Sequence, residues 1–132
     1  MRNLLDLTNL VLIAAGGGIG AVSRYLVTVF AAGRMGTAFP WGTISVNLLG
    51  SFLMGALMMG LLQTRWELSE NCRLLLTVGF LGGFTTFSSF SLETLTLIMN
   101  HNFLLAGANI FVNCVGGIIA AFLGMTAVRT LM

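Results

Sequence analysis

Long apolar runs separated by short polar stretches organise the whole chain. A membrane-spanning helix needs about 20 mostly apolar residues, and four segments meet that length, at residues 8–32, 41–63, 73–99 and 103–128. The stretches between them leave no room for a soluble domain. The pattern predicts an all-α membrane protein in which residues 1–132 form a single four-helix transmembrane domain.

Composition supports the same interpretation. Of the 132 residues, 57% are hydrophobic and only 8% are charged, and a soluble domain of this size cannot bury so much apolar surface. The first apolar run extends almost to Ala32, which is longer than the core of a signal peptide, so it is predicted to stay as the first membrane helix. The dispersed net charge of +2 argues against a nucleic-acid partner.

Basic residues give the chain little preference for one orientation in the membrane. One side of the membrane would carry Arg2, Arg65, Arg73 and Arg129, and the other side would carry Arg24 and Arg34. Cytoplasmic loops normally carry the excess of arginine and lysine, and this excess is weak. An ordinary protein with both ends in the cytoplasm and a chain that inserts both ways and pairs antiparallel both remain open.

Small residues recur at four-residue intervals in every predicted helix. The sets are Gly16 and Gly20, Ser51 and Gly55, Gly79 and Gly83, and Gly116, Ala120 and Gly124. This spacing makes flat faces on which helix backbones approach closely. Since four short helices offer few buried faces on their own, we expect a homodimer.

The third segment has an unusually polar interior and reads GFLGGFTTFSSFSLE over residues 79–93. Gly82 and Gly83, followed by Thr85 and Thr86, disfavour a continuous helix and predict a break near its middle. Lipid cannot satisfy the freed backbone groups, so a break persists only inside protein, near water or around an ion. A kink repaired by hydroxyl groups is the alternative.

A phenylalanine stripe follows the predicted break. Phe84, Phe87 and Phe90 recur every three residues, on roughly one helical face, among serine and threonine residues. Such a stripe is typical of core packing. A face that mixes phenyl edges with hydroxyl donors also suits a small anion, because the ring edge carries partial positive charge.

Two asparagines occupy matched positions in the second and fourth segments, which read NLLGSFLMGAL from Asn47 and NCVGGIIAAFLG from Asn113. An unpaired amide at membrane depth costs several kcal/mol, so each asparagine needs a partner. Each fits a polar clamp between helices, and the matched placement favours a lined pathway.

Charged residues inside the predicted spans are Arg24 and Glu93. Such residues are functional candidates: Arg24 would attract an anion to a pore entrance, and Glu93 would face a vestibule or pair with an arginine. Alternatively, both reach the membrane interface. The chain shows no nucleophile–base pair and no metal-ligand spacing among its cysteines and its one histidine, which predicts a protein that is not an enzyme.

On these residues the chain resembles the Fluc family of bacterial fluoride channels, also called CrcB proteins. The motifs are GGGIGAVSRY, WGTISVNLLGSFLMG, GFLGGFTTFSSFSLE and NCVGGIIAAFLG, and the resemblance covers nearly the whole chain. It implies an antiparallel, dual-topology homodimer in the bacterial inner membrane, with two pores that each use both chains. It also implies passive export of fluoride, which lowers fluoride toxicity in the cell.

The resemblance assigns roles to individual residues. Asn47 would donate to fluoride, and the ring edges of Phe87 and Phe90 would line its path. The polar track would consist of Thr43, Ser91, Asn109 and Asn113. Arg24 and Glu93 would be vestibule or structural charges. Backbone carbonyls of Gly82 and Thr85 from both subunits would hold a structural sodium ion.

Some residues depart from the family pattern. Asn109 and Asn113 stand where relatives often have Tyr, Ser or His, while Ser89 replaces a frequent Thr and Phe84 a frequent Leu.

Two other functions stay open. A dual-topology multidrug antiporter needs a carboxylate deep in the membrane, for which Glu93 is the only candidate. A non-transporting assembly subunit explains the glycines but not the mixed phenylalanine and serine face.

Overall fold

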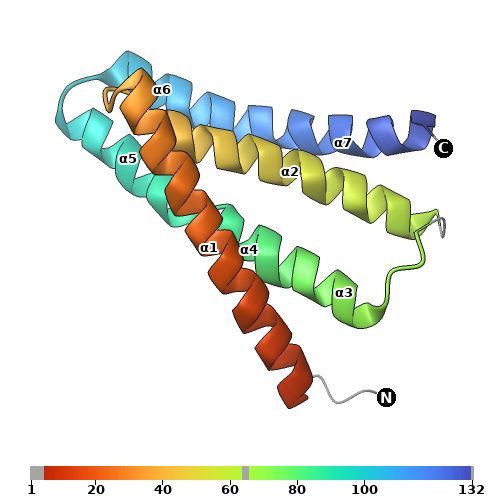
Figure 1. The fold of residues 1–132 in the computed structure, drawn as a ribbon. Coiled ribbons are helices and arrows are strands. Elements are labelled where there is room, and N and C mark those ends of the chain that lie inside the picture. Colours follow the sequence, from red (N-terminus) through yellow and green to blue (C-terminus); the bar gives the residue numbers. More distant parts are fainter. Residues whose placement is uncertain (1–4, 64–65, 132) are drawn as a thin grey trace.

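The computed structural model describes residues 5–63 and 66–131, and its regular secondary structure is entirely helical within these ranges. In chain order the elements are α1 (Leu7–Met35), α2 (Trp41–Leu62), α3 (Glu70–Leu74), η1 (Leu75–Leu81), α4 (Gly82–Phe84), α5 (Phe87–Met99), α6 (Phe103–Phe111), η2 (Val112–Gly116) and α7 (Gly117–Leu131) (Figure 1). The segments η1 and η2 are π-helical. Arg2 and Arg65, which enter the predicted charge balance, lie outside the described residues.

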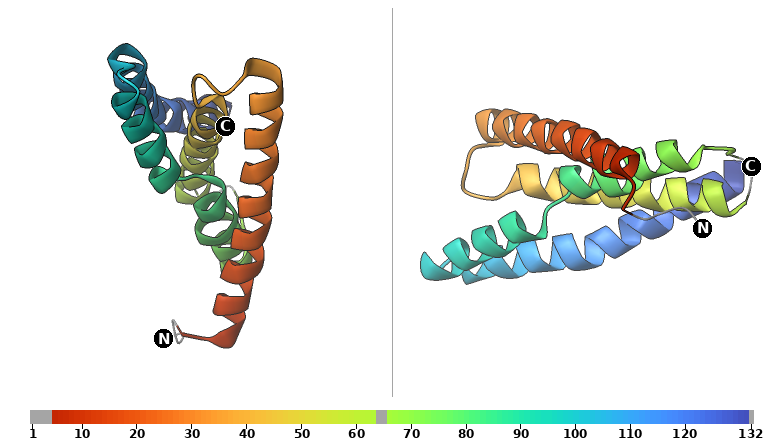
Figure 2. Two further views of the ribbon diagram at one scale, coloured as in Figure 1. Left: turned by 90° about the vertical axis from the view of Figure 1, so that its left-hand side faces the viewer. Right: turned by 90° about the horizontal axis from the view of Figure 1, so that it is seen from below.

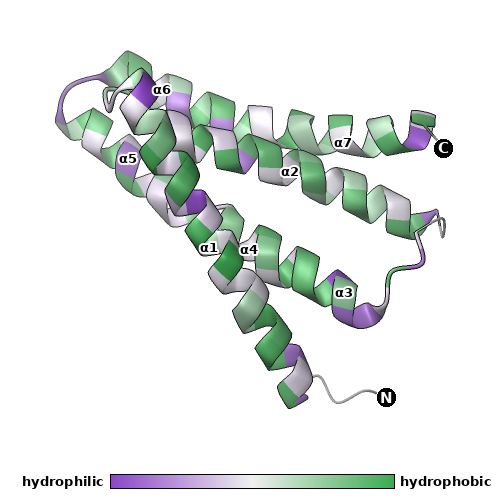
Figure 3. Ribbon diagram, viewed as in Figure 1, coloured by the Kyte–Doolittle hydropathy of each residue, from purple (hydrophilic) through white to green (hydrophobic). Residues whose placement is uncertain are grey.

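These elements combine into four spans that are long and apolar enough to cross a membrane. They cover Leu7–Met35, Trp41–Leu62, Glu70–Met99 and Phe103–Leu131. Apolar residues run along the helices, and hydrophilic ones gather mainly at helix ends and connections (Figure 3). The prediction of an all-helical protein with four candidate membrane crossings is confirmed.

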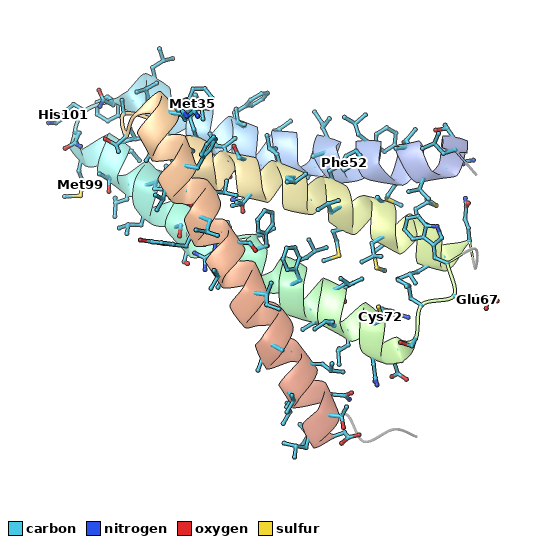
Figure 4. All side chains as sticks on the ribbon, in the orientation of Figure 1. Met35, Phe52, Glu67, Cys72, Met99 and His101 are labelled. Atoms are coloured by element: carbon cyan, nitrogen blue, oxygen red, sulfur yellow. The ribbon has the colours of Figure 1, made fainter. Side chains whose placement is uncertain are left out.

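The spans pack in an open arrangement around α2. Helices α2 and α7 lie side by side, and α1 crosses them to pack on η1 and α4 (Figures 1 and 2). Met99 and His101 mark one end of the molecule, and Glu67 and Cys72 mark the other (Figure 4). The start of α1 and the end of α7 both lie toward the Glu67 end, as an even number of crossings requires (Figure 1).

Local sequence signals set the ends of several helices. The Asp6 carboxylate accepts the Thr8 amide at 3.3 Å and caps the start of α1. Helix α1 ends before Gly36, whose φ of 79° is a backbone conformation that favours glycine. The turn between α5 and α6 uses His101 at φ 60°, with its amide donating to the Ile98 carbonyl at 3.0 Å.

Glycines make two close helix contacts, as their spacing predicted. A Cβ on Gly16 would lie 2.6 Å from the Leu75 carbonyl oxygen, and one on Gly20 would overlap the Phe80 carbonyl, so both bring α1 against η1. In the second contact, a Cβ on Gly55 of α2 would overlap a carbonyl of α7. Gly124 of α7 meets a carbonyl of α2 in the same way. Only a glycine at these positions allows such close backbone packing.

Much of the apolar surface stays uncovered within one copy of the chain. Within an 18-residue apolar stretch of each span, the buried share ranges from 11% in Leu7–Met35 to 28% in Trp41–Leu62. Large side chains such as Tyr25, Phe87 and Phe122 are mostly exposed. These faces are suited to lipid or to another copy of the chain.

Candidate functional site

The third span changes course between α4 and α5. Helix α4 ends at Phe84, and α5 begins at Phe87; Thr85 (φ −84°, ψ 157°) and Thr86 (φ −151°, ψ 123°) between them are extended. Gly82 itself remains helical, with φ −62° and ψ −39°. The extended pair leaves peptide groups at membrane depth that need partners from elsewhere in the protein.

Asn47 of α2 supplies those partners for Thr86. Its Oδ1 accepts the Thr86 amide at 2.8 Å, and its Nδ2 donates to the Thr86 carbonyl at 3.0 Å. One side-chain amide therefore satisfies both polar groups of an extended residue, much as a neighbouring strand would. The Thr86 hydroxyl completes the connection by accepting the Ser89 amide at 3.2 Å, which caps the start of α5.

The same bonds release backbone carbonyls on the preceding turn. In a continuous helix the Thr86 amide would donate to Gly82, and the Ser89 amide to Thr85. Both amides are directed to side chains instead, so the Gly82 and Thr85 carbonyls lose these donors. The Gly83 carbonyl, by contrast, accepts the Nε of Arg24 at 3.1 Å.

A cavity of about 470 Å³ lies against this interruption. Its wall includes Asn47, Gly82, Thr85, Phe87, Phe90 and Asn113. Phe87 is 76% exposed and Phe90 only 7%, and their ring centroids lie 5.4 Å apart. Amide groups, hydroxyl-bearing residues, carbonyls and phenyl rings thus meet around one space.

Phe84 does not continue the phenylalanine stripe onto this wall. It is buried and stacks on Phe80, with ring centroids 5.5 Å apart. The expectation of one face shared by Phe84, Phe87 and Phe90 is therefore wrong, because the extended residues between α4 and α5 interrupt the helical periodicity that would align them.

Side-chain amides extend from the cavity into the protein. Nδ2 of Asn47 donates to Oδ1 of Asn113 at 2.8 Å, and Nδ2 of Asn113 donates to Oδ1 of Asn109 at 2.8 Å. Asn109 has no exposed surface and donates to the Thr94 hydroxyl at 2.9 Å. Each buried amide therefore has partners, as stability in an apolar surrounding requires.

A second, smaller cavity of about 290 Å³ lies toward the connection between α1 and α2. The Thr43 hydroxyl donates to Oε1 of Glu93 at 2.7 Å, and both residues are on its wall. The other carboxylate oxygen, Oε2, is buried and has no hydrogen-bond partner within the part of the chain that the structure describes. Phe39 and Trp41 pack edge to face in the same wall, with ring centroids 5.0 Å apart.

The family of this chain is shown by a match over most of its length. Residues 11–125 match the model of the family described as CrcB-like protein, Camphor Resistance (CrcB). This chain belongs to that family. The match includes most of each of the four membrane-crossing segments and the complete wall of both cavities.

Relatives of this CrcB-like chain are similar over almost their whole length. A protein of Roseiflexus sp. (strain RS-1) is 45% identical over 93% of this chain and 98% of the relative. One of Magnetococcus marinus is 47% identical over 89% and 94%, and one of Geobacter sulfurreducens 42% identical over 95% and 100%. Each is named a fluoride-specific ion channel FluC. The resemblance and the expectation of a non-enzymatic protein are thereby confirmed.

The CrcB-like chain distributes the residues named from its sequence over three places. The larger cavity collects Asn47, Gly82, Thr85, Phe87, Phe90 and Asn113. The smaller one has Thr43 and Glu93. Three others lie on neither wall: Asn109 is buried behind Asn113, Arg24 binds the Gly83 carbonyl, and the Ser91 hydroxyl donates to the Phe87 carbonyl at 2.9 Å.

Sequence reasoning missed two contributors to this site. Thr86 was noted as part of the polar stretch, but its pairing with Asn47 joins residues 39 positions apart, which no local pattern indicates. Thr94 received no role, yet it is the buried partner of Asn109. The only available signal was a threonine placed one helical turn after Phe90, and that spacing is common.

Proposed function

We propose that this chain is a fluoride-selective channel that lets fluoride leave the cytoplasm passively, across the inner membrane of a bacterium. Its relatives are named fluoride-specific ion channels, which supports fluoride as the conducted ion. The observation that carries the proposal is the cavity beside the extended Thr85–Thr86 pair, where an amide donor, Asn47, meets the phenyl rings of Phe87 and Phe90.

The chemistry of that wall suits a small, strongly hydrated anion. Fluoride holds its water tightly, so a pore must offer hydrogen-bond donors in place of the hydration shell without binding the ion permanently. Asn47 carries an amide donor, and the edges of Phe87 and Phe90 carry partial positive charge. Neutral hydrogen fluoride enters a cell and dissociates at cytoplasmic pH, so the anion then leaves down its electrochemical gradient.

The working unit in this proposal is an antiparallel homodimer with two pores. Phe87 faces outward with 76% of its surface exposed, so one copy leaves the proposed ion path open on one side. A second copy would close it and cover other exposed apolar faces. The weak arginine bias of the sequence, four residues against two, fits a chain that inserts in both orientations.

The residues at the interruption fit a structural sodium ion. Uncharged carbonyl oxygens of unwound membrane helices are typical sodium ligands, and Gly82 and Thr85 have lost their usual helical donors. Two carbonyls are too few for one cation, so we propose that the same pair from a second copy completes the site. A bound sodium ion would supply positive charge that joins the two interrupted helices.

The remaining charges have supporting roles in this proposal. Arg24 acts as a structural charge, because its Nε compensates the Gly83 carbonyl beside the interruption. Thr43 and Glu93 line a separate cavity, which would be the vestibule of the path. Ser91 holds the first turn of α5 beneath Phe87.

The unpartnered Oε2 of Glu93 favours one competing function. A carboxylate in a membrane cavity is what a proton-coupled antiporter needs. In that case replacing Glu93 with glutamine would abolish transport, and replacing Phe87 would have little effect.

Ion release from liposomes tests the proposal. The purified protein is reconstituted, and fluoride and chloride release are recorded with ion-selective electrodes for the wild type, Phe87→Ile and Phe122→Ile. Phe122 is a matched control, since it is 64% exposed on α7 and lies on neither cavity wall. We expect fast fluoride release and no chloride release from the wild type and Phe122→Ile, and loss of release from Phe87→Ile. Equal fluoride release from both variants would contradict the role of Phe87.

A further inference from the structure

A one-way series of side-chain hydrogen bonds leads away from the larger cavity. Asn47 donates to Asn113 and Asn113 to Asn109, each over 2.8 Å between Nδ2 and Oδ1. Asn109 then donates to the Thr94 hydroxyl at 2.9 Å, and that hydroxyl donates to the Phe90 carbonyl at 2.8 Å. We call these four residues, Asn47, Asn113, Asn109 and Thr94, the amide series. After Asn47, each of them accepts from the residue before it and donates to the group after it.

The direction of the amide series is fixed at both ends. At the cavity, the Thr86 peptide binds both polar atoms of the Asn47 amide, so a turned amide would face donor to donor and acceptor to acceptor. At the far end, the Phe90 carbonyl can only accept, so the Thr94 hydroxyl donates to it and offers its lone pair to Asn109.

Asn113 in the middle is consequently held in one orientation. Its Nδ2 donates to the Asn109 side chain and also to the Asn109 backbone carbonyl, at 2.8 and 2.9 Å. Its Oδ1 is thereby turned toward Asn47. The residue is half-buried and forms part of the cavity wall, so this oxygen lies beside the space proposed for the anion.

Asn47 has no free amide hydrogen in this arrangement. A side-chain amide nitrogen carries two donors; one is directed to the Thr86 carbonyl and the other to Oδ1 of Asn113. The Thr86 contact is a two-point clamp. An anion in the cavity therefore gains a hydrogen bond from Asn47 by displacing the Asn113 oxygen.

We propose that Oδ1 of Asn113 is a built-in competitor for the anion at Asn47, and that Asn109 and Thr94 are positioning residues that keep it in place. This deepens the proposed function and rests on it. Fluoride, a small and strong acceptor, replaces the amide oxygen, and the returning oxygen helps to release it. Conduction needs this compromise between binding and release. If Asn113 were itself a donor to fluoride, its replacement would weaken fluoride binding; as a competitor, its replacement should strengthen fluoride binding.

Fluoride currents through the full-length protein in planar phospholipid bilayers, recorded over a range of fluoride concentrations, test the competitor. In Asn113→Ala the half-saturating concentration should fall about fivefold, which corresponds to the net value of one competing hydrogen bond. Val115→Ala is the control, since Val115 is 40% exposed on the same π-helical turn and lies on neither cavity wall. An unchanged or higher half-saturating concentration in Asn113→Ala overturns the proposal.

Two distant threonines test the positioning role without touching the cavity wall. Thr94→Val keeps the side-chain shape but cannot accept from Asn109, so Asn113 is held less firmly and the half-saturating concentration should fall about twofold. Thr94→Ser should restore the wild-type value. Thr126→Val is the matched control, because Thr126 makes the same bond to the carbonyl four residues back, at 2.9 Å, outside the amide series.

The outcomes separate this inference from the function on which it rests. A folded wild-type protein that carries no fluoride current contradicts the proposed function. A wild-type protein that conducts, together with Thr94→Val at the wild-type half-saturating concentration, contradicts only the positioning role of Thr94 and Asn109.

Discussion

The second span meets the fourth in two chemically opposite ways. Toward the Glu67 end, Gly55 and Gly124 bring α2 and α7 into direct backbone contact. Nearer the other end, Asn47 and Asn113 join α2 to η2 through an amide hydrogen bond of 2.8 Å. One helix pair therefore combines a dry contact that requires small residues with a polar contact that requires complete hydrogen bonding.

The difference between these contacts distinguishes a packing role from the ion-conducting role that we propose for the larger cavity. Glycine contacts need only shape, and many membrane helices are joined in this way. Buried amides are costly unless every donor and acceptor is paired, and membrane proteins retain such groups mainly where they serve a function. The polar contact also lies on the wall of the larger cavity, whereas Gly55 and Gly124 do not.

Disrupting the glycine contact should have the largest effect on folding. In Gly55→Ala the new Cβ overlaps the Ala121 carbonyl, so α2 and α7 must separate, at a cost of about 1–3 kcal/mol or more. The amount of folded protein recovered by size-exclusion chromatography in detergent should drop sharply. Gly107→Ala is the control, since a Cβ there meets nothing within 4 Å. Similar losses from both variants would show that the contact does not control folding.

Removing the clamp at the polar contact should have the next largest effect. Asn47→Leu leaves the amide and carbonyl of Thr86 without partners; because both bonds are only partly buried, we expect a combined cost of about 1–3 kcal/mol. Thermal unfolding in detergent should shift to lower temperature, and fluoride release should be lost. Asn47→Asp keeps the acceptor for the Thr86 amide and should unfold at an intermediate temperature. A wild-type melting temperature for Asn47→Leu would contradict the clamp.

Sodium removal should have a moderate effect, if the carbonyls freed at the interruption hold this ion. Replacing sodium by N-methylglucamine in the detergent buffer should lower the melting temperature and promote dissociation of the proposed dimer, because an ion that binds only the folded state stabilises that state. The melting temperature should recover as sodium is added back. No dependence on sodium between zero and molar concentrations would argue against the site.

Loss of the helix cap beside the clamp should have the smallest effect. Thr86→Ala removes the hydroxyl that accepts the Ser89 amide, which typically costs about 1 kcal/mol, while Thr86→Ser keeps it. Thermal unfolding should rank the serine variant near the wild type and the alanine variant slightly below it. An alanine variant as unstable as Asn47→Leu would mean that the hydroxyl, and not the Asn47 amide, supports the extended pair.

Sequence patterns were sufficient for the spans and for the close glycine contacts. A hydrophobic run of membrane length is a local property, and so is the four-residue spacing of Gly16 and Gly20. In the third span, Gly82 stays helical and the extended residues are Thr85 and Thr86.

The partners of the polar residues could not be predicted in the same way. The pairing of Asn47 with Thr86 and of Asn109 with Thr94 depends on how separate helices pack and turn. The π-helical turn η2 adds to this difficulty, because it alters the helical register around Asn113. A single sequence has no local signal for such a register change, so it did not indicate that Asn109 is buried behind Asn113.

Fluoride release per folded protein, measured side by side for Gly55→Ala and Asn47→Leu, tests the central distinction most directly. Each variant is purified by size exclusion, and only the folded fraction is reconstituted into liposomes. We expect that folded Gly55→Ala releases fluoride at the wild-type rate and that folded Asn47→Leu releases none. Wild-type release from Asn47→Leu, or loss of release from well-folded Gly55→Ala, would contradict the division between the two contacts.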